Sequence, residues 1–168
     1  MIVVQQLFDL LGIDGEIERN SQSAASVENA LANNHLLVET QQAVEEAQET
    51  LRMQGGERRD LEITVESSQE KGKELEGKLY GGAVRNPREL KDMQSELNLL
   101  RERQKEEEES LLMALEAIEE TERGLSNLEN TLLEIQSAWQ VEYARLLEER
   151  AQLQGDLALL EVKRQNQT

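Results

Sequence analysis

Residues 79–90 read LYGGAVRNPREL, and they are the main basis for predicting the fold. Their two adjacent glycines can take the left-handed backbone conformation that commonly ends an α-helix. After them, Asn86 suits the N-cap of a new helix and Pro87 its first position, while Glu89 can bond back to the cap. The stretch predicts a turn between two helices, and four of its residues have structural roles: Gly81, Gly82, Pro87 and Glu89.

The residues after this turn carry a seven-residue hydrophobic repeat. Stepping by seven from Leu90 to Leu160 gives eleven positions, and ten of them are apolar, the exception being Gln104. The chain as a whole is only 38% hydrophobic, so this series is strongly enriched. Such a repeat is typical of a helix that packs along another helix in a coiled coil. It predicts a second coiled-coil helix over residues 87–165, followed by a tail of residues 166–168.

The residues before the turn carry a weaker repeat that changes phase once. One seven-step series runs from Leu10 to Val38, and another, displaced by one residue, runs from Leu37 to Leu79. This pattern predicts a first coiled-coil helix over residues 1–78 and a tip turn over residues 79–86. Adjacent glycines at 55–56 interrupt the first helix, because each costs about 1 kcal/mol relative to Ala. We interpret the pair as a local bend, with a functional hinge or a complete break as alternatives.

These patterns together predict an all-α fold, a long antiparallel two-helix coiled-coil hairpin. A loop of about six residues forces consecutive helices to fold back as antiparallel neighbours. The composition agrees, since 2% aromatic residues argue against a compact β-sandwich or α/β domain.

Several function classes are excluded by residues that the chain lacks. It contains no Cys and a single histidine, His35, so it cannot form a thiolate zinc site or a Ser-His-Asp triad. We therefore expect no enzymatic activity, no catalytic residues, no metal ligands and no cofactor in this chain. No run approaches the roughly 18 apolar residues of a membrane span, and the start lacks the basic region of a signal peptide. These features predict a cytoplasmic protein without membrane contact.

Charge is distributed unevenly around the turn. The net charge of −17 divides into −10 for residues 1–77, +3 for residues 78–91 and −10 for residues 92–168. Turn structure does not require the basic or the aromatic side chains of the middle segment. The candidate partner-binding residues at the tip are therefore Tyr80, Val84, Arg85, Asn86 and Arg88.

A family resemblance accompanies the turn. Residues 79–80, 86–90, 93–94 and 96–97 resemble the turn signature of bacterial coiled-coil proteins that carry a C-terminal four-cysteine zinc ribbon. The opening residues 7–17 also look like the N-terminal pattern of that family. The resemblance implies a long antiparallel hairpin and an adaptor role near transcription or the flagellar and secretion machinery. Without Cys, the ribbon is absent here, and zinc is expected only in a ribbon of a longer protein.

Several functions compete at this point. The first is a protein-interaction adaptor that presents its hairpin tip to other proteins, as a monomer or weak homodimer. The alternatives are a nucleic-acid-binding protein that uses the basic tip, and a purely architectural coiled-coil spacer. A hairpin that delivers metal-binding carboxylates into a transcription channel ranks last, because this tip carries Arg85 and Arg88 instead of acidic residues.

Overall fold

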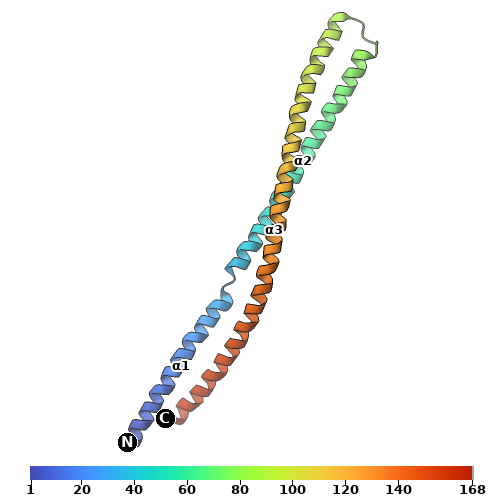
Figure 1. The fold of residues 1–168 in the computed structure, drawn as a ribbon. Helices are drawn as coiled ribbons and strands as arrows, with labels where there is room; N and C mark the ends of the chain where they lie inside the picture. The colour runs from blue at the N-terminus through green and yellow to red at the C-terminus, as the bar shows by residue number, and fades with distance from the viewer. Residues whose placement is uncertain (168) are drawn as a thin grey trace. The chain divides into compact units, whose positions relative to one another are not determined.

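The computed structural model describes residues 1–167, and nearly all of them are helical. Three helices follow one another along the chain (Figure 1): α1 (Ile2–Ala32), α2 (His35–Tyr80) and α3 (Pro87–Gln167). No strand occurs within residues 1–167, so the predicted all-α class is confirmed. The chain divides into two compact units, one formed by residues 1–41 with the part of α3 after residue 129, the other by residues 42–129.

The seven-step series of α3 marks its covered side, which we call the seam. All eleven positions from Leu90 to Leu160 are buried or half-buried. Large apolar side chains outside the series, such as Leu99, Leu112 and Met113, are between 59% and 70% exposed. Long helices gain most of their stability from packing an apolar stripe and little from propensity. The periodicity therefore identified correctly which side of α3 is packed.

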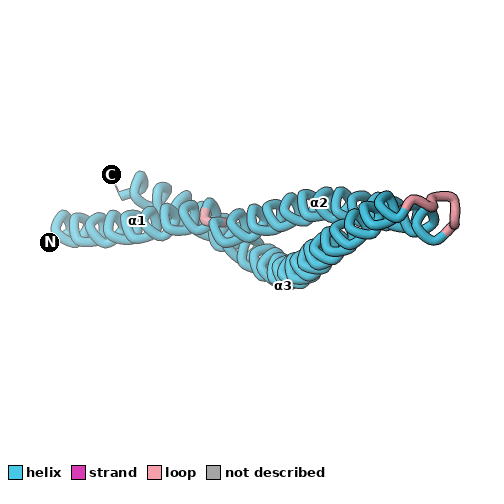
Figure 2. Tube along the Cα trace, turned by 90° about the horizontal axis from the view of Figure 1, so that it is seen from above, coloured by secondary structure: helices cyan, strands magenta, loops and turns pink. Residues whose placement is uncertain are grey.

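The unit of residues 42–129 is a helical hairpin in which α2 and α3 lie side by side (Figures 1 and 2). The turn of residues 81–86 joins the two helices, and Val65 and Leu97 are buried at 7% and 5% exposure. An ion pair between Glu76 and Arg101 crosses from α2 to α3. Both apolar packing and polar contacts thus connect the two helices.

The hairpin also contains a buried polar contact. Gln104 is only 9% exposed, and its Nε2 donates a hydrogen bond of 2.6 Å to the backbone carbonyl of Ser68 on α2. Gly72 lies next to this amide, since a Cβ added to Gly72 would lie 3.0 Å from Gln104 Nε2. The one polar member of the α3 series thus has a buried partner, as a buried polar group requires.

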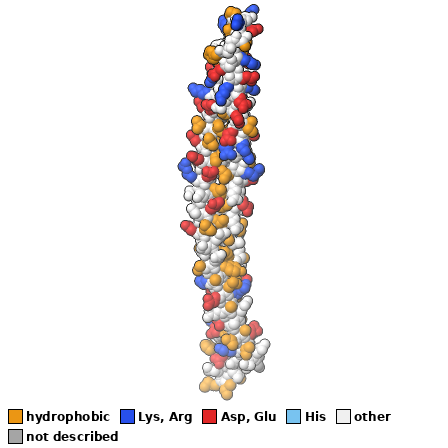
Figure 3. All heavy atoms as spheres, turned by 90° about the vertical axis from the view of Figure 1, so that its right-hand side faces the viewer, with side chains coloured by type: hydrophobic (Ala, Val, Ile, Leu, Met, Phe, Trp, Pro, Cys, Tyr) orange, Lys and Arg blue, Asp and Glu red, His pale blue; other side chains and the backbone are white. Residues whose placement is uncertain are grey.

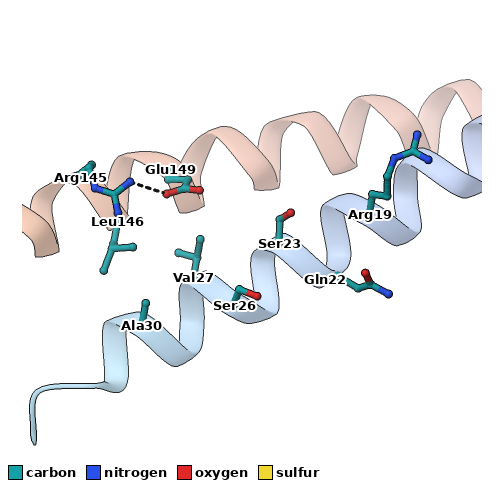
Figure 4. A pocket seen from close by; sticks show the side chains of 9 residues that line it. All are labelled: Arg19, Gln22, Ser23, Ser26, Val27, Ala30, Arg145, Leu146 and Glu149. Carbon is teal, nitrogen blue, oxygen red and sulfur yellow. Dashed lines mark hydrogen bonds and ion pairs between the residues drawn. The ribbon is translucent and has the colours of Figure 1, made fainter.

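The other unit packs α1 and the start of α2 against the C-terminal part of α3. Val27 and Leu146 are the most buried apolar side chains in the structure, each 4% exposed. Both side chains point into the space between α1 and α3, where they line a pocket with small polar residues of α1 (Figure 4). Two ion pairs flank this packing, Glu28 with Arg150 at 3.4 Å and Asp14 with Arg164 at 2.9 Å.

The predicted single helix over residues 1–78 is divided at Asn33 and Asn34. Asn33 has non-helical angles, with φ −90° and ψ 85°, and its N–H donates to the carbonyl of Ala30 at 3.2 Å. The carbonyl of Asn34 then accepts the first bond of α2, from the N–H of Val38 at 3.0 Å. Asn favours such positions because its side chain competes with helical hydrogen bonds. The break coincides with the phase change between the two seven-step series.

The glycine pair at residues 55–56 contradicts one of its predicted alternatives, the complete break. Both residues lie inside α2, which continues without interruption to Tyr80. The pair is half-buried in the hairpin, where packing offsets the poor helix propensity of glycine. A complete break at this pair was therefore a wrong alternative.

The helix ends also differ slightly from the predicted boundaries. α2 ends two residues beyond residue 78, and α3 extends to Gln167, so residues 166 and 167 of the predicted tail are helical. Arg164 in the last turn of α3 is a cation near the negative end of the helix dipole, which favours this extension. Residue 168 lies outside the described residues.

Two glycine substitutions with opposite effects test this description of the hairpin. Gly82 has φ +74°, so Gly82→Ala should destabilise by about 1–2 kcal/mol. Gly55 lies in a helix, and a Cβ added there would meet nothing within 4 Å, so Gly55→Ala should stabilise by about 0.5–1 kcal/mol. Urea unfolding of both variants provides the measurement, and effects of the same sign would contradict the assignment.

A double-mutant cycle tests the buried contact between the helices. With Gln104 present, Gly72→Ala must displace its amide, which opposes the normal helix gain of about 0.5–1 kcal/mol. In a Gln104→Ala background the same substitution should show the whole gain. The free energies of unfolding should therefore differ from additivity by at least about 0.5 kcal/mol. Strict additivity would show that the two residues do not contact each other.

Candidate partner-binding surface at the turn

The two glycines of the turn stand where a side chain would be strained. α2 ends at Tyr80, and Gly82 has the only positive φ found within residues 1–167. A Cβ on Gly81 would overlap the backbone carbonyl oxygen of Gly77 in the last turn of α2. Glycine is thus the residue that both positions accommodate without strain.

The polar residues of the turn start α3. Asn86 Oδ1 accepts a hydrogen bond of 3.0 Å from the backbone N–H of Arg88, and its carbonyl accepts one of 3.0 Å from Leu90. Pro87 is the first residue of the helix, a position at which its missing N–H costs nothing. Glu89 lies in the first turn, but its side chain forms no hydrogen bond within residues 1–167, so the expected bond back to the cap is absent. Its negative charge still suits the positive end of the helix dipole.

The predicted tip residues surround this turn and are accessible. Tyr80 is 75% exposed at the end of α2, although tyrosine side chains in folded proteins are usually partly buried. Val84 is half-buried, whereas Arg85, Asn86 and Arg88 are exposed. The turn thus brings an aromatic ring, an aliphatic side chain and two guanidinium groups together on one short segment.

The two arginines of the tip differ from the nearest lysine of α2 in their ion pairing. Neither Arg85 nor Arg88 forms an ion pair within residues 1–167, whereas Lys78, one turn before, pairs with Glu74 at 3.6 Å. Arg88 lies in the first turn of α3, where a cation is mildly unfavourable for the helix dipole. Packing and ion pairing within the described residues therefore do not account for these two charges.

Surface ion pairs occur elsewhere along the helices. Arg145 donates hydrogen bonds of 2.6 and 3.1 Å to the Glu142 carboxylate, and these bonds lower the pKa of Glu142. Arg52 and Glu49 repeat this arrangement on α2, and Arg52 likewise lowers the pKa of Glu49. Both pairs join residues three apart on one helix, which is ordinary surface chemistry.

The single histidine, the acidic side chains and the helices provide no further candidate site among the described residues. His35 is the exposed first residue of α2. No group of three or more His, Asp or Glu side chains in residues 1–167 is arranged to hold a metal ion. Among the described helices, none combines the length and the apolar character that crossing a membrane requires.

The structure also contains a pocket that the sequence interpretation missed. A pocket of about 320 Å³ lies beside the break between α1 and α2. Trp139 lines it, and its ring lies 5.8 Å from that of Tyr143 at an angle of 50°. Leu36 and Leu37 of α2 line the pocket together with both residues of the break, Asn33 and Asn34. The adjacent asparagines at the phase change were the signal that could have revealed it.

No protein-family model, curated protein or solved structure matches this chain. The assignment of a function therefore depends on the chain's own residues and their geometry.

The cap of α3 can be tested separately from binding. Asn86→Ala removes the acceptor of the Arg88 N–H and should destabilise the protein by about 1 kcal/mol. Asn86→Ser retains a capping oxygen and is the matched control, with an expected loss of only a few tenths of a kcal/mol. Thermal or urea unfolding of the two variants gives the comparison. Equal stability of both variants would show that the cap contributes nothing.

Proposed function

We propose that this protein is a non-catalytic protein-interaction adaptor that presents the tip of an antiparallel coiled-coil hairpin. The observation that carries the proposal is the exposed cluster at the turn. It combines a 75% exposed tyrosine with two exposed arginines that have no ion-pair partner within residues 1–167. Tyr and Arg are, with Trp, the side chains enriched at the energetic centres of protein interfaces.

The coiled-coil packing of the hairpin is part of this proposal. Its support is the seven-residue series of α3, whose members are all covered, and the cross-helix contacts of Gln104 and Arg101. A polar residue at a core position of a coiled coil commonly fixes register at some cost in stability. A hairpin of this kind holds its turn at a defined place, which is what a binding tip needs.

A protein partner is favoured over nucleic acid by the charge of the chain. Phosphate contacts dominate nucleic-acid affinity, and residues 78–91 around the tip contribute a net charge of only +3 to a chain of −17. The apolar surfaces of Tyr80 and Val84 favour a mixed interface with an acidic and apolar protein surface. Nucleic acid and a purely architectural spacer remain the two alternatives, and the experiment below distinguishes them.

The resemblance of the turn to zinc-ribbon coiled-coil proteins suggests where the adaptor acts. It points to partners in bacterial transcription or in the flagellar and secretion machinery, in the cytoplasm. The zinc of such proteins would belong to a ribbon, for which this chain has no cysteines.

Reversing the two tip charges tests the proposal. Arg85→Glu/Arg88→Glu should leave helicity and the unfolding midpoint nearly unchanged, because exposed substitutions usually stay within about 0.5 kcal/mol. Capture of a protein partner from the native cell should be lost, since reversed charges introduce repulsion at a small interface. Quantitative mass spectrometry of proteins captured by the wild type and by the variant provides the measurement.

The matched control is Arg59→Glu/Lys105→Glu. It changes the net charge by the same amount at two exposed positions away from the turn, and capture should persist. Partner capture that survives in the tip variant would refute binding by the tip. Capture that depends on nucleic acid, shown by its loss on nuclease treatment, would favour the first alternative, and capture of nothing by any variant would favour the spacer.

A further inference from the structure

The first three turns of α1 carry an apolar face that the described residues leave mostly exposed. Its members are between 56% and 75% exposed. Figure 3 shows hydrophobic side chains gathered at the end of the molecule where α1 begins. The five residues of this face, which we call the α1 face, are Val3, Val4, Leu7, Phe8 and Leu11.

The α1 face is distinct from the stripe that packs on α3. Leu10, Ile13 and Ile17 are half-buried, and they form the packed stripe of α1. At 100° per residue, Leu7 and Leu11 lie on a different side of the helix from Ile13 and Ile17. The beginning of α1 is therefore apolar on two sides, only one of which has a partner within the described residues.

The chain is unusually uncharged at this place. Among the side chains of residues 1–13 only Asp9 is charged, although charged residues make up 32% of the chain. Asp9 precedes Leu11 by two residues and so lies about 200° away from it around the helix. None of the five side chains of the α1 face is charged, on a protein that is otherwise strongly acidic.

We infer that the α1 face is a homodimer interface, which a second copy of this chain covers. A two-fold interface must be complementary to itself, and an apolar patch without charge meets this condition. Two chains of charge −17 repel each other, so contact costs least where neither copy presents charge. The uncharged face also offers no group with which to select a charged partner of another kind.

The apolar area of the α1 face agrees with a second copy of the chain as its partner. Five side chains with about 100 Å² each to bury supply on the order of 500 Å² of apolar surface per copy. A standard interface buries about 800 Å² per partner, and in homodimers about 65% of that is apolar. The face therefore supplies about the apolar area that such a dimer needs. This inference does not depend on the proposed binding role of the tip.

Sedimentation equilibrium at about 100 µM chain tests the inference, since interfaces of this size hold at micromolar or lower concentrations. The wild type should be a dimer. Leu7→Glu/Leu11→Glu places four carboxylates in the interface and should weaken association at least about 100-fold, giving a monomer of unchanged helicity. The matched control is Leu112→Glu/Met113→Glu, which alters two similarly exposed apolar side chains of α3 and should remain a dimer.

Each other outcome overturns the inference. A wild type that is monomeric at this concentration has no such interface, and a Leu7→Glu/Leu11→Glu variant that stays dimeric places the interface elsewhere. A monomeric wild type that floats with vesicles of neutral phospholipid would assign the face to a lipid surface. Partner capture through the tip should be the same in this variant and the wild type, which separates failure here from failure of the proposed function.

Discussion

Burial of the α3 seam against the neighbouring helices governs most other features of this structure. Packed helices in each unit share a single line of contact, so no side chain within residues 1–167 falls below 2% exposure. The most buried apolar residues, Val27 and Leu146, still retain 4%. Stability is therefore spread along the seam, and no single core residue dominates it. Such a structure tolerates a helix break or a poor helix former provided that the apolar stripe stays covered.

Two departures illustrate this tolerance. Gly55 and Gly56 remain helical in α2, because the residues on either side of them, Leu51 and Leu61, keep their half-buried positions on the stripe. Asn33 and Asn34 do break the helix, and they do so where the apolar series of α1 and α2 are out of phase. The break lets each series continue against α3, so that Leu31 and Leu37 are both half-buried. Seam coverage, more than helix propensity, thus decides where the chain stays helical.

Packing along the seam also determines which side chains remain on the surface. Side chains that do not join the seam stay exposed along the described helices, as Leu99, Leu112 and Met113 of α3 do. Two surfaces carry side chains that packing does not explain, the basic turn with Arg85 and Arg88 and the apolar start of α1. They differ in character, since one is charged and the other is not. An adaptor that joins copies at one surface and holds a different partner at the other would use both.

The all-α class, the position of the turn and the packed side of α3 follow from the amino-acid sequence, because they depend on local chemistry and periodicity. Two adjacent glycines, a capping Asn86 and a seven-step series can be identified without knowledge of the partner helix. The break of the first helix at Asn33, the bond from Gln104 to the carbonyl of Ser68 and the exposure of Leu7 and its neighbours are known from the three-dimensional structure. Each of these depends on which residues of the facing helix lie opposite. That relation arises from packing between segments far apart in the sequence, which no local pattern encodes.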